Sequence, residues 1–260
     1  MKRIFILVTI LATSFLFSLN AANAHNFYKN DASIFFTLIK QFQGESELTR
    51  SNFPQNTSLA LEHAENAAGF LRKIINFKED NLDDKDFADT YNLISNNLNS
   101  TTNALIATNL GDEIMKQYGV AIGLNSSAAS KLTNMSMSTS RSSDDNQSGM
   151  AMSKSMVNTS NTSSNKIVNP GNYQTAIMLA DSLKATYSND LRNAKLPNST
   201  GLMSLPMQLR LSSVNDLGNG IDNLISALKR KAVLDEVTSI VHGQIHPNAF
   251  MAFDLRLKSD

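Results

Sequence analysis

Residues 207–228 read MQLRLSSVNDLGNGIDNLISAL and carry the clearest periodicity in the chain. Large apolar side chains recur there at steps of three and four residues, which is the spacing of one face of an α-helix. They are Met207, Leu211, Val214, Leu217, Ile221, Leu224, Ile225 and Leu228. The stretch therefore predicts a long amphipathic helix, with Gly218 and Gly220 as weak points because glycine lowers helix stability.

The same spacing recurs along most of the remaining chain. A first helix is expected to begin at Asn30 or Asp31 and to end before Pro54, because the residue before a proline disfavours helical backbone. Further helices are predicted to start at Thr57 or Ser58 and after Pro170. The others cover about 87–123 and 233–246, and Pro247 separates a short one at 248–257. No alternating pattern predicts a strand, so the sequence indicates an all-α, up-and-down bundle of about six helices.

Residues 125–166 differ from the helical segments on both sides. Serine, threonine, asparagine and methionine dominate there, and no apolar period survives. Such a segment buries too little apolar surface to offset its conformational entropy, so we predict a long disordered linker. It separates an N-terminal helical half at 25–124 from a C-terminal half at 167–260. Three helices make a thin core, and we expect the two halves to share one bundle.

The N-terminus has the three parts of an export signal. Lys2 and Arg3 give a positive start, residues 4–19 are almost wholly apolar, and Ala22-Asn23-Ala24 supplies small residues for a signal peptidase. We predict that residues 1–24 are removed and that the mature chain acts outside the cytoplasm, secreted, periplasmic or at the cell surface. The alternative is an uncleaved anchor. No later stretch approaches the ~20 apolar residues that a membrane-spanning helix needs.

Composition excludes several kinds of function. The chain contains no cysteine, which excludes thiolate metal sites and cysteine nucleophiles. Loss of Lys2 and Arg3 leaves 21 basic against 23 acidic residues with no basic run, so nucleic acid is not an expected partner. Sequons for N-glycosylation are frequent, and five of the eight lie between 125 and 161. They begin at Asn56, Asn99, Asn125, Asn134, Asn146, Asn158, Asn161 and Asn198.

Four histidines are the main candidates for chemistry. His25 becomes the first residue after cleavage, where its amine and ring nitrogen can chelate one ion. His63 lies beside the expected apolar face of its helix, where a hydrogen-bonded boundary residue is the alternative interpretation. That face contains Leu61, Ala64, Ala67, Ala68, Leu71, Ile74 and Ile75. His242 and His246 are four residues apart, the spacing that places two imidazoles on one helical face. Convergence of His25, His63, His242 and His246 would create a site for copper(II) or zinc(II).

Methionines in the linker are the second indication of copper. Five of the eleven lie there, at Met135, Met137, Met150, Met152 and Met156. Thioether sulfur is a soft ligand that suits copper(I), so these residues are auxiliary copper(I) candidates. Compositional drift and a sacrificial oxidation target are the alternatives.

The segments that contain the histidines resemble exported helical proteins of unassigned function from ammonia-oxidising archaea. The likeness rests on His25-Asn26-Phe27, on Leu61-Glu62-His63-Ala64 and on the sequence VHGQIHPN at 241–248, which has the HxxxHPN motif of those proteins. It covers both helical parts and leaves out the linker. The resemblance implies an extracytoplasmic protein in organisms whose energy metabolism depends on copper enzymes. It implies no catalytic role.

These patterns lead to one functional prediction and one alternative. The prediction is an exported metal-binding protein that binds, stores or delivers copper, with zinc as the second choice. The alternative is a structural or interaction module of the cell envelope that has a glycosylated spacer, binds no metal and docks to a membrane or envelope protein. An enzyme is less favoured, because no Glu follows His242 as the HExxH protease motif requires and no other acid or base is paired with the histidines.

Overall fold

Helices form all the regular secondary structure in the part of the chain that the structure describes. The structure is a computed structural model, and it describes residues 30–81, 91, 92, 95, 98–134, 165–198 and 205–256. Its elements are α2 (Asp31–Asn52), α3 (Thr57–Asn81), α5 (Ser100–Ala121), α6 (Ser126–Lys131), the 3₁₀ turn η1 (Leu132–Asn134), α7 (Pro170–Thr186), the π turn η2 (Tyr187–Leu191), α8 (Met207–Lys229), α9 (Leu234–Ile240), the π turn η3 (Val241–Ile245) and α10 (His246–Phe253). The predicted all-α bundle is confirmed.

Asparagine side chains cap the starts of several helices. The Oδ1 atoms of Asn30 and Asn169 accept hydrogen bonds from backbone N–H groups three residues further on, as a helix N-cap does. The predicted starts of the first helix and of the helix after Pro170 are therefore confirmed. Asn99 caps α5 in the same way. The prediction of one helix over about 87–123 was wrong on this point, because a capping residue has non-helical backbone and α5 begins only at Ser100.

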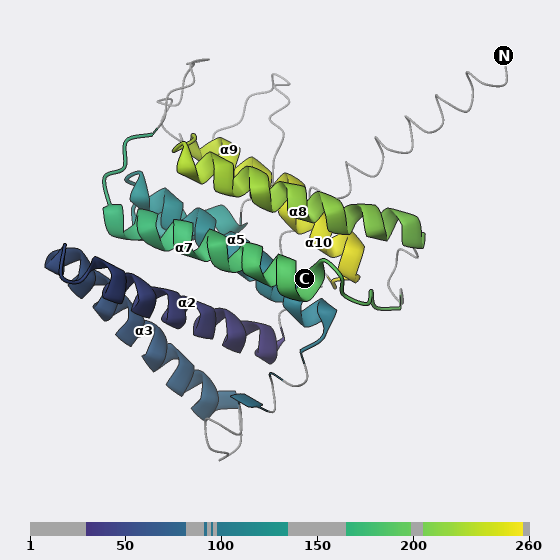
Figure 1. Cartoon of the computed structure of the whole chain (residues 1–260), viewed down its shortest axis with the longest axis horizontal. Helices are drawn as coiled ribbons and strands as arrows, with labels where there is room; N and C mark the ends of the chain where they lie inside the picture. The colour runs from purple at the N-terminus through teal and green to yellow at the C-terminus, as the bar shows by residue number, and fades with distance from the viewer. Residues whose placement is uncertain are drawn as a thin grey trace, which may run out of the picture.

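The buried helix α5 lies at the centre of the bundle, as Figure 1 shows. The pair α2 and α3 packs on one side of α5 and α7, and α8 with α9 and α10 packs on the other. Residues from both predicted halves form one hydrophobic core, in which Phe35, Ile106, Leu179 and Leu217 are fully buried. None of the helices in the described ranges is long and apolar enough to cross a membrane.

The start of the predicted linker is folded. Asn125 Oδ1 accepts a hydrogen bond from Ala128 N and caps α6, which continues into η1. Ala129 and Leu132 in these turns are buried. Burial of these two apolar side chains thus holds in place a segment whose composition predicts disorder. Residues 135–164, the remaining core of that prediction, lie outside the described residues, as do residues 1–29 with the predicted signal peptide.

The face that α3 turns toward the core only partly matches the prediction. Ala67 and Ile74 are buried as expected, whereas Leu61, Leu71 and Ile75 were expected to point inward and are 60%, 42% and 44% exposed. Ala60 and His63 complete the buried face at helical spacing. The helix thus has two neighbouring sets of residues at helical spacing, and only one of them packs in the core. The one with small alanines and a histidine packs against α2, because His63 finds a buried polar partner there.

Pro247 does not separate two helices as predicted. Proline lacks the N–H that would bond to the carbonyl four residues earlier. The backbone accommodates the missing hydrogen bond by forming the π turn η3, in which His246 N–H donates to Val241 O five residues earlier. The helix therefore continues from α9 through η3 into α10, and His246 is the first residue of α10 instead of a terminal cap.

Two glycines within helices have opposite roles, which predicts opposite effects of one substitution. A Cβ on Gly69 of α3 would meet no atom within 4 Å, whereas a Cβ on Gly218 of α8 would collide with the buried Tyr187 ring. Gly69→Ala is expected to raise the free energy of unfolding by about 0.5–1 kcal/mol through helix propensity. Gly218→Ala is expected to lower it by about 1–3 kcal/mol through overpacking. Urea denaturation of both variants measures the two signs, and equal effects would contradict the assigned contact.

Candidate functional site

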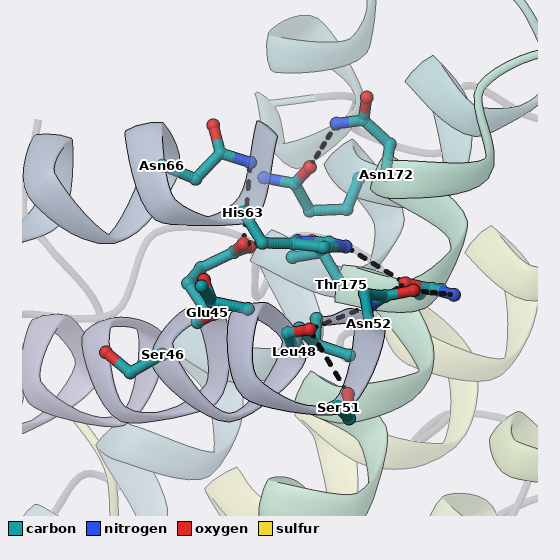
Figure 2. A network of polar contacts seen from close by, with 12 residues as sticks. Glu45, Ser46, Leu48, Ser51, Asn52, His63, Asn66, Asn172 and Thr175 are labelled. Carbon is teal, nitrogen blue, oxygen red and sulfur yellow. Dashed lines mark hydrogen bonds and ion pairs between the residues drawn. The ribbon is translucent and has the colours of Figure 1, made fainter. Parts of the chain in front are cut away.

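His63 is completely buried where α3 meets α2 and α7. Its Nδ1 lies 2.7 Å from Glu45 Oε2 on α2, and its Nε2 lies 3.0 Å from Gln174 Oε1 on α7. Figure 2 shows the ring enclosed between these helices. Both ring nitrogens face oxygen acceptors, which a histidine satisfies together only as a doubly protonated imidazolium. The contacts therefore describe a buried ion pair of His63 with Glu45.

Further polar side chains surround the carboxylate of Glu45, which is 1% exposed. Thr175 Oγ1 donates to Glu45 Oε1 over 2.6 Å, and Asn66 Nδ2 lies 3.4 Å from Oε2 (Figure 2). On the other side, Asn52 Nδ2 donates to Gln174 Oε1 over 2.8 Å. Both carboxylate oxygens and both ring nitrogens have partners, as a buried charge requires. We call Glu45, His63, Gln174 and Thr175 the buried polar cluster.

The charge of His63 follows from opposing influences on its pKa. Burial alone lowers the pKa of an imidazole, because it disfavours the charged form. The hydrogen bond and the negative charge of Glu45, with a smaller contribution from Gln174, outweigh burial and raise the pKa of His63 above its usual value of 6.5. The geometry and the direction of the pKa shift both favour the protonated form of His63.

This raised pKa predicts how stability depends on pH. The folded state holds the His63 proton more tightly than the unfolded chain, so the stabilising contribution is complete below about pH 6.5 and is lost as pH rises through the folded pKa. We expect the unfolding free energy of the wild type to fall as pH rises above 6.5 and through the folded pKa of His63. The variant His63→Gln, which cannot titrate, should show a flatter profile in urea denaturation. Parallel profiles for the two proteins would contradict the ion pair.

His242 and His246 form a second buried group. Their rings meet edge to face with centroids 5.2 Å apart, as expected of residues on one helical face. His242 Nε2 donates to Leu132 O over 3.1 Å, and His246 Nε2 lies 3.3 Å from Thr108 O and 3.4 Å from Asp112 Oδ1. The pair therefore links η3 and α10 to η1 and α5.

The structure brings His242 and His246 together and does not bring His63 to them. His63 has its partners on α2 and α7, whereas the pair contacts α5 and η1. Within the described ranges, no three histidine, aspartate or glutamate side chains are placed so as to hold a metal ion. His25 and the methionines Met135, Met137, Met150, Met152 and Met156 lie outside those ranges.

A groove of about 730 Å³ lies between α2 and α7 next to the buried polar cluster. The two helices are antiparallel, because Asn52 bonds to Gln174 while Gly44 meets Met178. Gly44 has no side chain, so the Met178 thioether lies directly on the α2 backbone and forms the floor. Leu48 and Ile177 add apolar walls.

Polar side chains form the edges of the groove. They are Lys40, Gln43 and Glu47 of α2 and Gln174, Asp181 and Ser182 of α7. Burial lowers the pKa of Lys40, and the negative charge of Asp190 partly opposes this effect. Gln174 lines the groove and also bonds to His63, so the buried polar cluster holds one end of the groove in place.

Sequence reasoning missed Glu45, Gln174 and Thr175. A signal for Glu45 was present in the sequence, because Glu45 continues the helical spacing of the apolar residues Phe35, Ile39 and Phe42. A charged residue on such a face needs a buried partner. The partner itself was not readable, since Gln174 is 111 residues away from His63 along the chain.

Comparison with known proteins identifies no family for this chain. The chain matches no protein-family model, no curated protein and no solved structure. The resemblance to exported archaeal proteins therefore stays a prediction.

Proposed function

We propose that this chain is a helical interaction module that binds an apolar helical segment of a partner protein in the groove between α2 and α7. The observation that carries this proposal is the groove itself, with its apolar floor and polar edges. Its volume of about 730 Å³ is in the range of pockets that bind specific ligands. We further propose, from the predicted export signal at residues 1–24, that the module acts outside the cytoplasm.

The shape of the groove favours a helix as the occupant. Its walls extend from Lys40 to Leu48 on α2 and from Tyr173 to Ala185 on α7. At 1.5 Å per residue these stretches are roughly 12–18 Å long, which matches about two to three turns of a bound helix. Such a helix anchors side chains at every third or fourth position. Met178 is suited to receive them, because its flexible thioether adapts to different shapes.

Peptide binding tests this proposal directly. The probe is a fluorescein-labelled amphipathic 18-residue peptide of leucine, alanine and lysine, titrated with the purified full-length chain. We expect saturable binding by fluorescence anisotropy, weakened at least tenfold in Met178→Glu and Ala185→Glu. The matched control is Leu209→Glu, an exposed apolar position on α8 away from the groove. Equal affinity in all three variants would refute a site in the groove.

The second candidate is metal binding at His242 and His246, which the sequence favours for copper. The specific observation is the approach of two imidazoles to 5.2 Å, with the Asp112 carboxylate 3.4 Å from His246. Binding would have to withdraw ring nitrogens from the carbonyls of Leu132 and Thr108 or to use further ligands outside the described ranges, where His25 lies. Copper titration with metal analysis separates the cases. His242→Ala should abolish binding while His63→Gln retains it, and unchanged stoichiometry in both would remove this candidate.

A further inference from the structure

One flank of the long helix α3 carries an apolar stripe. Leu61, Leu71 and Ile75 are 60%, 42% and 44% exposed, and Ala64 and Ala68 lie between them. In the described part of the chain, α3 packs mainly on α2 and touches α7 only through its first half. The stripe lies beside the face of α3 that packs on α2, and its Leu71 also lines a hollow with Ile39 and Phe42 of α2. None of its residues lines the groove of the proposed function.

The spacing of this stripe is that of a coiled coil. The steps from Leu61 through Ala64, Ala68 and Leu71 to Ile75 are three, four, three and four residues. This is the heptad pattern in which apolar side chains of two helices interlock along one seam. Although the stripe adjoins α2, Leu61, Leu71 and Ile75 keep 42–60% of their surface exposed, so they can contact a second helix.

Two charged residues at one edge of the stripe indicate which kind of helix can pair with it. Glu65 and Arg72 are both exposed and seven residues apart, so they occupy the same heptad position with opposite charges. When two such helices pair antiparallel, residues at this position meet their counterparts across the seam. We propose that two copies of this chain associate through α3 in this way, with each Glu65 beside Arg72 of the second copy.

In one antiparallel register, the opposite charges lie side by side and the apolar side chains also face one another. This register places Leu61 opposite Leu71 of the second copy and Ala64 opposite Ala68. The same contacts recur on both sides of a two-fold axis, as in most homodimers. A shift by one heptad brings Arg72 against Arg72, which is unfavourable. In a parallel pair, Glu65 and Arg72 would lie beside the edge of the second copy's α3 that is buried against its own α2. That edge has no charged side chain to pair with them.

The oligomeric state of the full-length chain tests this dimer. The seam is short, so we expect a dissociation constant on the order of 10 µM in sedimentation equilibrium. Leu61→Glu and Leu71→Glu should each give a monomer throughout the micromolar range, and their helical circular dichroism should be retained because both sites are exposed. Leu211→Glu on α8, which is 46% exposed in the wild type, is the matched control and should still dimerise.

Charge exchange and cross-linking test the register. Glu65→Arg and Arg72→Glu should each weaken the dimer about tenfold, and the double variant should restore it, because the pairs re-form with reversed signs. The chain has no cysteine, so mixing Ala64→Cys with Ala68→Cys should give a disulfide-linked heterodimer faster than either variant links to itself. A wild type that remains monomeric up to 1 mM would overturn the proposal, as would a double variant that stays as weak as the singles.

Discussion

Replacing Glu45 with alanine is expected to lower the free energy of unfolding by about 3–5 kcal/mol. The side chains of Glu45 and His63 are 1% and 0% exposed, so solvent cannot take the place of the lost carboxylate. The variant leaves the His63 cation buried without its counter-ion and deprives Thr175 Oγ1 of its acceptor. Removing one partner of such a pair costs more than the net value of the pair itself.

Chemical denaturation followed by circular dichroism measures this effect. The matched control is Glu47→Ala, two residues along the same helix, whose carboxylate pairs with Arg50 on the exposed surface. That substitution should leave the denaturation midpoint nearly unchanged. The double variant Glu45→Ala/His63→Ala should be less destabilised than the sum of the single variants, because no unpaired charge remains. Additive losses would show that the two side chains do not act as an ion pair.

Glu45→Ala should also change peptide binding in the groove between α2 and α7. Gln174 bonds to His63 and to Asn52 and also lines the groove between α2 and α7. Loss of Glu45 removes the group that orients His63, and His63 in turn fixes Gln174. We therefore expect weaker peptide binding in Glu45→Ala than in the wild type under conditions where both proteins are folded, although Glu45 does not line the groove.

Local signals made the helices readable from the sequence. The cap predicted at residue 30 or 31 and the prolines at 54 and 170 act on their own neighbours. Accordingly, α2 begins at Asp31 and ends before Pro54, and α7 begins at Pro170. The core face of α8 was readable because Val214, Leu217, Ile221 and Leu224 repeat at helical spacing and are buried. Such features depend on a few consecutive residues, which is why periodicity and capping suffice.

The site depended on contacts that no local pattern contains. On α3 the sequence offers two helical stripes, and hydrophobicity alone favoured the one with Leu61 and Leu71, which is exposed. The choice is made by Glu45 on another helix, which makes burial of His63 favourable. The histidines were expected to converge because they are few and share metal-binding chemistry. Their positions instead follow from separate partners, a carboxylate for His63 and backbone carbonyls for His242 and His246.

Arg210→Met is expected to lower the free energy of unfolding by about 2–3 kcal/mol. Arg210 is 3% exposed at the start of α8. Its Nε and Nη2 donate to Ala252 O over 3.1 and 2.9 Å, and its Nη1 donates to Pro197 O over 2.7 Å. Ala252 lies in the last turn of α10, where carbonyls lack helical partners and carry the negative end of the helix dipole. The guanidinium therefore joins α8 to the end of α10 and to the loop after η2.

The planar geometry of arginine is essential to this contact. An ammonium group lacks the fork of donors that reaches two carbonyls at once, so Arg210→Lys should recover only part of the loss. Arg50→Met is the control, because Arg50 is exposed and its removal should leave the midpoint nearly unchanged. Hydrogen exchange of the α10 amides locates the effect, which should be faster exchange there and little change in α2. A methionine variant as stable as the wild type would mean that the carbonyls of Ala252 and Pro197 are satisfied without the guanidinium, and the end of α10 would then need another cap.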